Sequence, residues 1–164
     1  MANKNFTEWY IAGLHALRSA SEQGSEAASE LQAGTTSEEI KSLLVEYQRI
    51  AAEQQQNYVG FLKALDTEPT GFKDRIMEGV GSGTDEMVKA APDQDLVDLS
   101  AISGSVSGLD YYVGAFKDQG ALASRLGLHE QSATMQSMGQ AAQQLRDRFF
   151  AVAEKVRAKA SVDA

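Results

Sequence analysis

Cysteine is absent from the 164 residues of this chain, which excludes disulfide bonds, thiolate metal ligands and cysteine nucleophiles. Proline and histidine are scarce, with two residues of each. No apolar run approaches the roughly 20 residues that a membrane-spanning helix needs. The first ten residues also lack the basic segment and apolar stretch of a signal peptide. We therefore expect a soluble cytoplasmic protein with no membrane association.

Positive charge is also in short supply. The chain has 15 basic and 23 acidic residues, for a formal net charge of −8. Such a chain repels phosphate backbones, and nucleic-acid-binding proteins normally carry a basic surface. The one basic concentration, from Arg146 to Lys159, lies where it would complement the negative end of a helix dipole. The sequence predicts no nucleic-acid partner.

Helical periodicity is the dominant positive signal, and alternating strand patterns are nearly absent. The spacing predicts long helices over 6–31, from Ser37 to about residue 65, from Pro92 to beyond residue 116, and from about residue 128 onward. A shorter helix is predicted over 71–80, resuming over 85–90 after a flexible glycine-rich break. The inward stripes of the second and last long helices are Ile40, Leu44, Tyr47, Ala51, Gln54, Tyr58, Phe61 and Leu65, and Met135, Met138, Ala142, Leu145, Phe149, Val152 and Val156.

This pattern predicts an all-α fold. We expect a four-helix bundle with a short additional helix in the connection between the two helix pairs. The length suits a single domain over 1–164.

Four short sequence motifs and the spacing between them indicate a particular family of helical bundles. They are Thr36-Ser37-Glu38-Glu39-Ile40-Lys41, Phe61-Leu62 through Glu68-Pro69, Met77-Glu78-Gly79, and Leu122-Ala123-Ser124-Arg125-Leu126-Gly127. Over nearly its whole length the chain resembles the YciE/YciF-type ferritin-like family. The resemblance implies a ferritin-like bundle that associates as a homodimer and has a stress-related role in bacteria. It also implies interior Glu and His residues suited to a two-metal centre.

The positions that would correspond to those ligands carry other residue types. The resemblance puts them at Ile50 and Gln54; at Leu109, Asp110, Tyr111 and Tyr112; and at Gln140, Ala141 and Ala142. In the first helix Glu22 is the best remaining match. Most of the centre implied by the resemblance is therefore missing.

The residue types and their spacing also predict the absence of a di-metal centre, independently of the resemblance. A bundle di-metal site needs one glutamate from each of two helices and a Glu-x-x-His pair from each of the others. Neither histidine fits, because Ala12 lies three residues before His15 and Leu126 three before His129. From residue 131 to 146 the last helix has no Asp, Glu or His. We expect no metal ligands, no catalytic residues and no cofactor, in a bundle whose seam is filled by residues such as Leu109.

For several polar residues the sequence allows two interpretations. The acids Glu22, Glu46, Glu53 and Asp110 could form an atypical metal site, although a hydrogen bond from a tyrosine of another helix to a partly buried Asp110 is the preferred interpretation. Gln54 either fixes helix register through a buried hydrogen bond or is a remnant of the two-metal centre that the resemblance implies.

Small and aromatic residues suggest two further features. Gly104 and Gly108, with Ser100, Ser103 and Ser107, leave space in the fourth long helix for Tyr47, Tyr58, Met135 or Met138. Incomplete filling would leave an apolar pocket. Phe6, Trp9 and Tyr10 pack either on a second subunit or in the core.

The leading functional hypothesis is a non-catalytic helical bundle protein that acts through self-association, as a homodimer, or through an unidentified protein partner. One alternative is an oxidoreductase or iron-handling protein with an atypical metal site. A second alternative is a protein that binds a small apolar ligand in the vacated centre.

Overall fold

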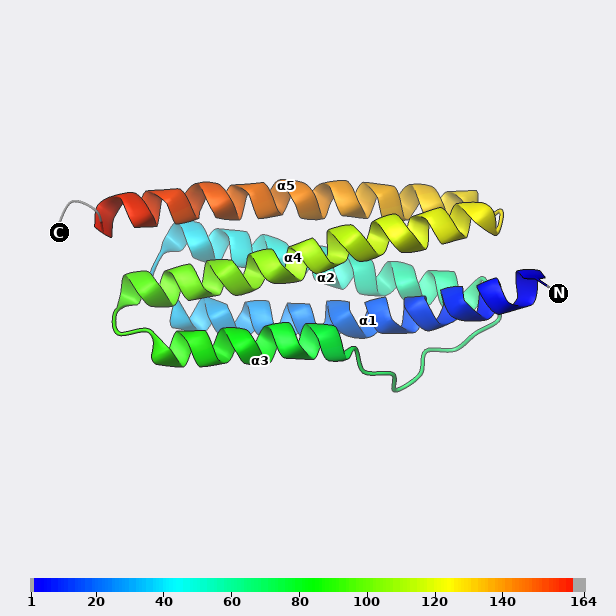
Figure 1. Cartoon of the computed structure of the whole chain (residues 1–164), viewed down its shortest axis with the longest axis horizontal. Helices are drawn as coiled ribbons and strands as arrows, with labels where there is room; N and C mark the ends of the chain where they lie inside the picture. The colour runs from blue at the N-terminus through cyan, green and yellow to red at the C-terminus, as the bar shows by residue number, and fades with distance from the viewer. Residues whose placement is uncertain (1, 161–164) are drawn as a thin grey trace.

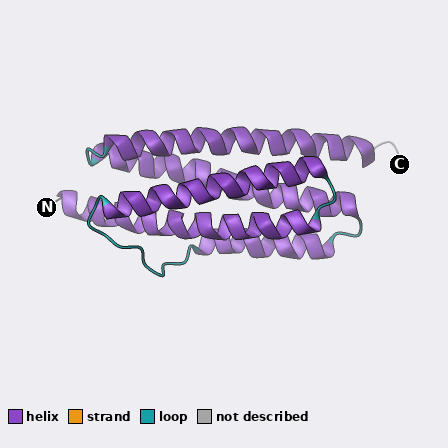
Figure 2. Ribbon diagram, turned by 180° about the vertical axis from the view of Figure 1, so that it is seen from behind, coloured by secondary structure: helices purple, strands orange, loops and turns teal. Residues whose placement is uncertain are grey.

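The computed structural model describes residues 2–160. Within this range the chain forms helices α1 (Ala2–Gly34), α2 (Glu38–Lys63), α3 (Arg75–Ala90), α4 (Gln94–Arg125) and α5 (His129–Ala160). Only helices and loops occur in the part of the chain described (Figure 2). The predicted all-α class is confirmed.

Two antiparallel hairpins form the bundle (Figure 1). The first hairpin is α1 with α2 and the second is α4 with α5, and they meet through α1 against α4 and α2 against α5. The shorter α3 follows the extended segment 64–74 and lies along α1 and α4. This is the predicted four-helix bundle with an additional helix between the helix pairs.

Local sequence explains the starts of three helices and the turn between α4 and α5. The side chains of Ser37, Asp74 and Asp93 accept hydrogen bonds from backbone N–H groups three residues on, which caps the N-termini of α2, α3 and α4. Between α4 and α5, Gly127 has φ 79°, a left-handed conformation that glycine adopts without steric cost. The first helix is longer than predicted at both ends, running from residue 2 to 34.

The predicted break at residues 79–83 is wrong, because α3 runs through all three glycines. A glycine in a helix interior costs about 1 kcal/mol relative to alanine. Packing against neighbours offsets this cost: Met77 is buried, and the side chain of Thr84 fits against Gly104 of α4. Tertiary contact has overridden local propensity here.

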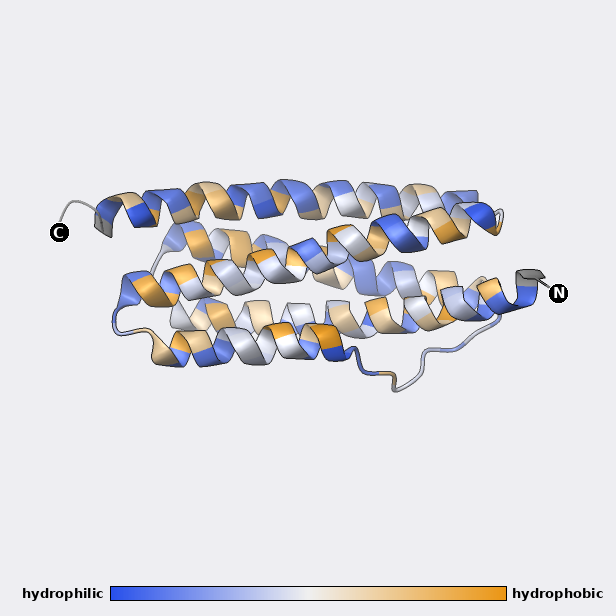
Figure 3. Cartoon of the chain, in the orientation of Figure 1, coloured by the Kyte–Doolittle hydropathy of each residue, from blue (hydrophilic) through white to orange (hydrophobic). Residues whose placement is uncertain are grey.

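The predicted apolar stripes form the core (Figure 3). All seven stripe residues of α5 are buried, as are the α2 stripe residues up to Tyr58, while Phe61 and Leu65 are half-buried. No helix within residues 2–160 is long and apolar enough to cross a membrane.

Candidate functional site

The middle of the bundle is filled by large side chains. Tyr112 and Phe116 of α4 stack with ring centroids 5.6 Å apart, and Tyr47 of α2 packs on Tyr112 at 6.2 Å. Tyr58 contacts Phe116 at 6.3 Å. Leu109 is 1% exposed. The seam around these residues is therefore occupied by close-packed aromatic and apolar groups.

A few polar groups are buried in the same region. The hydroxyl of Tyr112 donates to the backbone oxygen of Ala20 at 2.8 Å, and the hydroxyl of Ser21 donates to Oε1 of Gln54 at 3.3 Å. The second bond joins α1 to α2, which agrees with a role for Gln54 in helix register. The amide Nε2 of Gln54 and the hydroxyl of Tyr58 are buried without a hydrogen bond of acceptable geometry.

Burial also makes these tyrosines poor metal ligands. Desolvation raises the pKa of Tyr47, Tyr58 and Tyr112 well above its ordinary value, because the apolar surroundings disfavour the phenolate. At neutral pH these side chains are neutral phenols rather than anionic oxygen ligands.

The four remaining candidate acids lie on the surface and pair with arginines. Glu22 pairs with Arg18 at 3.4 Å and Glu53 with Arg49 at 2.5 Å, each within one helix. Glu46 pairs with Arg148 at 2.5 Å, and Asp110 pairs with Arg146 at 2.8 Å.

The preferred interpretation of Asp110 is therefore wrong. Its side chain is 52% exposed and binds arginine rather than a tyrosine. The neighbouring Tyr111 instead donates its hydroxyl proton to Asp74, at 2.6 Å.

The residues present do not fit a two-metal group. Of the positions implied by the resemblance, Ile50, Leu109, Tyr112 and Ala142 are buried and offer no anionic ligand, and Asp110 points to solvent. Within residues 2–160, no three side chains of the His, Cys, Asp and Glu types come together in a way that could hold a metal ion.

A buried carboxylate that the sequence did not single out joins three helices. Asp74, 4% exposed, caps α3 through Met77 N and accepts the Tyr111 hydroxyl of α4. Its own backbone N–H donates to Ser19 of α1 at 3.0 Å. Asp is a preferred N-cap residue, so its capping role could be predicted from sequence, but the partners from α1 and α4 depend on tertiary packing.

The space beside the small residues of α4 is filled by fewer of the proposed side chains than the sequence analysis predicts. Thr84 lies against Gly104, and the Tyr47 hydroxyl lies where a Cβ at Gly108 would come within 2.5 Å. Met135 instead packs against Gly120. Tyr58, for its part, contacts Phe116. Of the four proposed fillers, Tyr47 is the one found at these glycines.

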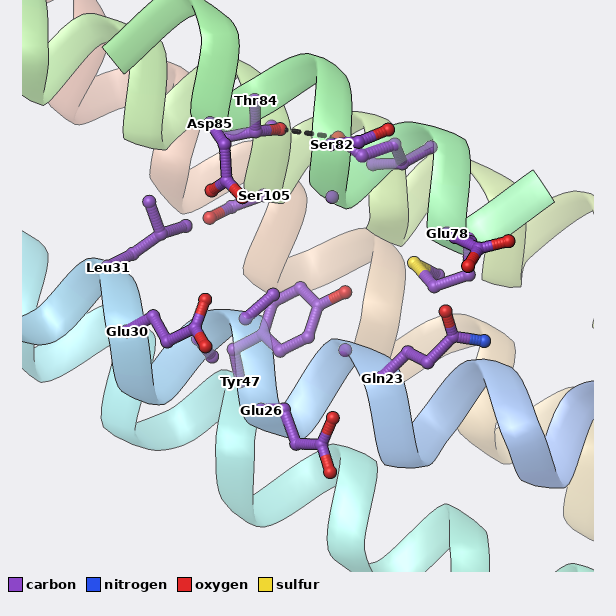
Figure 4. Close-up of a pocket in the computed structure, with 17 residues that line it drawn as sticks. Gln23, Glu26, Glu30, Leu31, Tyr47, Glu78, Ser82, Thr84, Asp85 and Ser105 are labelled. Carbon is purple, nitrogen blue, oxygen red and sulfur yellow. Dashed lines mark hydrogen bonds between the residues drawn. The ribbon is translucent and has the colours of Figure 1, made fainter. Parts of the chain in front are cut away.

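A cavity of about 260 Å³ opens between α1 and α3, beside the packed bundle centre (Figure 4). Tyr47 forms part of its floor, and Glu30 and Asp85 lie on opposite sides of it. Its lining comes from four helices and is made of Gln23, Gly24, Glu26, Ala27, Ala28, Glu30, Leu31, Tyr47, Met77, Glu78, Val80, Gly81, Ser82, Thr84, Asp85, Gly104 and Ser105.

The N-terminal aromatics divide between core and surface. Tyr10 is fully buried and donates to Oε1 of Gln131 at 2.7 Å, so it joins α1 to α5. Phe6 is 41% exposed beneath the guanidinium of Arg125, and Trp9 is 66% exposed.

Solved structures with the same fold include two bacterial proteins. The stress protein YciF of E. coli matches with a TM-score of 0.88 and 15% sequence identity, over 94% of this chain and 98% of that one. YcfI of Rhodopseudomonas palustris, a candidate structural protein, matches with a TM-score of 0.83 and 15% identity, over 88% of this chain and 92% of that one. At this identity the likeness shows the fold alone, and the predicted ferritin-like bundle is confirmed.

Comparison with curated proteins found no match. A family model for a domain of unknown function, DUF892, matches residues 5–161, and the chain therefore belongs to that family.

Proposed function

We propose that this protein is a non-catalytic ferritin-like bundle that acts by association, as a homodimer in the bacterial cytoplasm, under stress. The observation that carries the proposal is the packed bundle centre. Leu109 and Tyr112 lie at positions where the resemblance implies metal ligands, and both are 1% exposed.

Surface chemistry supports association as the mode of action. Trp9 exposes two thirds of its surface at the N-terminal end of α1. The segment 131–145 of α5 carries no charged residue, although the whole chain has a net charge of −8. Exposed aromatic groups and uncharged surface are where two copies of an acidic protein can approach with the least electrostatic repulsion.

Metal analysis tests the non-catalytic part. Protein purified from cells supplied with iron and manganese is expected to contain neither metal in stoichiometric amount, and the variants Glu46→Gln and Asp110→Asn should not alter the content. Glu38→Gln, at an exposed acid of the first turn of α2, is the matched control. Stoichiometric iron or manganese that is lost in Glu46→Gln or Asp110→Asn would overturn the proposal in favour of an atypical metal site.

Sedimentation equilibrium tests the association part. The wild-type protein is expected to be a dimer at micromolar concentration, and Trp9→Ser should raise the dimer dissociation constant at least about tenfold, as loss of an interface tryptophan commonly does. Phe150→Ser, at an aromatic residue of α5 that is 45% exposed, serves as the control and should leave the constant unchanged. A monomeric wild type, or equal effects of the two substitutions, would contradict this part.

A further inference from the structure

The cavity between α1 and α3 remains open because α3 has glycine where other helices carry side chains. A Cβ added at Gly79, Gly81 or Gly83 would meet no atom within 4 Å. None of the three has a positive φ, so backbone geometry does not require glycine there. Of the three, Gly81 lines the cavity.

The inner part of the cavity is apolar, and its side chains are held in place by close packing. Tyr47 is 4% exposed and Met77 is 4% exposed, and they approach from α2 and α3. The Tyr47 hydroxyl lies between Gly24 of α1 and Gly108 of α4, where a Cβ at either glycine would come within 3.1 Å of it. This crowding holds the ring in place. A ligand would therefore meet a floor that is formed before it arrives.

The rim is acidic and largely without counter-ions. Glu26 and Glu30 of α1 and Asp85 of α3 are exposed, and no ion pair within residues 2–160 engages them. Figure 4 shows Glu30 of α1 and Asp85 of α3 on opposite sides of the opening. The fourth rim acid, Glu78, is already paired with Lys73 and Arg75.

Unpaired carboxylates around an apolar floor favour one class of occupant. Like charges one helical turn apart, as at Glu26 and Glu30, repel each other unless a cation lies near them. The net charge of −8 raises the local concentration of cations further. An aromatic side chain in the floor suits the apolar body of such a cation. The volume of about 260 Å³ is just below the range of about 300–1,000 Å³ typical of ligand sites, which limits the occupant to a small molecule.

We propose that the cavity between α1 and α3 binds a small organic cation, an ammonium group carried on an apolar body, with Tyr47 and Met77 around the body and Glu30 and Asp85 around the charge. The cavity shares Tyr47 with the bundle centre but opens between α1 and α3. The proposal holds whether or not the protein dimerises.

Three probes of equal length test the charge selectivity: hexylammonium, hexan-1-ol and hexanoate, titrated into the full-length protein by calorimetry at low ionic strength. One hexylammonium is expected to bind per chain, about tenfold more tightly than hexanol, since each exposed carboxylate contributes a modest attraction. Hexanoate should not bind. Equal affinity for hexylammonium and hexanol, or no binding of hexylammonium, would overturn the proposal.

Substitutions then locate the site. Gly81→Leu puts a side chain into the cavity and should weaken hexylammonium binding at least about tenfold, whereas Gly79→Leu adds the same side chain to α3 at a position that does not line the cavity. Both replace glycine with a better helix former, so circular dichroism should show both folded.

The double variant Glu30→Gln with Asp85→Asn separates charge from shape. It should reduce hexylammonium affinity about fivefold and leave hexanol affinity unchanged. If Gly79→Leu weakens binding as much as Gly81→Leu, or if the double variant affects both probes equally, the cavity is not the binding site.

Discussion

The tyrosines show at the residue scale how identical side chains take different roles. Tyr112 donates to a backbone oxygen, Tyr111 donates to Asp74, and Tyr10 donates to Gln131. Tyr58 lies beside Ser21 but is buried without a hydrogen bond of acceptable geometry. A buried hydroxyl without a partner costs free energy, whereas one with a partner offsets its desolvation.

The two buried tyrosines Tyr58 and Tyr112 should contribute differently to the free energy of unfolding. Tyr58→Phe should leave the free energy of unfolding unchanged or raise it by up to about 1 kcal/mol, because it removes an unsatisfied hydroxyl. Tyr112→Phe should lower it by about 1 kcal/mol, because it removes a satisfied one. Urea denaturation followed by circular dichroism measures both, and a larger loss in Tyr58→Phe than in Tyr112→Phe would refute the reasoning.

His15 gives a pH-dependent prediction. Burial, and then the nearby Arg18, lower the pKa of His15 below its ordinary value of 6.5, and its Nδ1 has no hydrogen bond. The unfolded chain therefore binds more protons at this site than the folded chain once the pH falls below about 6.5. Stability from this group is complete above that pH and is lost as the pH falls toward the folded-state pKa.

The urea midpoint of the wild type should accordingly drop between pH 7.5 and pH 5.5. His15→Gln, which cannot titrate, should show a smaller drop over the same interval. Parallel pH profiles for the two proteins would mean that His15 does not contribute.

At the scale of the helices, α3 depends on Asp74 more than α4 depends on its own cap. Asp74 is buried and also binds Tyr111, whereas Asp93 is exposed and accepts one bond, from Leu96 N at 2.9 Å. The same residue type therefore contributes unequally at the two helix starts.

Alanine at each cap measures the difference. Asp93→Ala should cost about 1 kcal/mol, the usual loss of an N-cap. Asp74→Ala should cost about 2–4 kcal/mol, because it also leaves the partly buried Tyr111 hydroxyl without its acceptor. Denaturant unfolding gives both values, and equal losses would show that the bond between Asp74 and Tyr111 adds nothing.

Over the whole molecule, stability is expected to be uneven. The long helices share one apolar core, but Met77 is the one buried residue of α3, which also contains three interior glycines. Helices with few buried contacts open locally at lower free energy than the core.

Hydrogen exchange should therefore be fastest, among the helices, in α3. Amides of 79–88 should exchange before those in the middle of α2 and α4. Gly83→Ala, at a position with open space around it, should slow exchange in α3 and leave α2 unchanged. Protection in α3 equal to that of α4 would contradict this view of the molecule.

The sequence by itself determined the helices, their inward faces and the poor fit to a di-metal centre, because helical periodicity and ligand chemistry are local properties. The stripe from Met135 to Val156 is buried as the spacing predicted. The lack of a Glu-x-x-His pair at either histidine is a property of the residue order alone.

Tertiary structure alone decided where polar groups find partners and where space is left. Asp110 pairs with Arg146 and Asp74 with Tyr111 because of the way the helices pack side by side, which no spacing along one helix specifies. The continuity of α3 through its glycines was decided by contacts with α4, against local propensity. The acidic cavity between α1 and α3 follows from the same packing, since it forms where α3 lacks a side chain at Gly81.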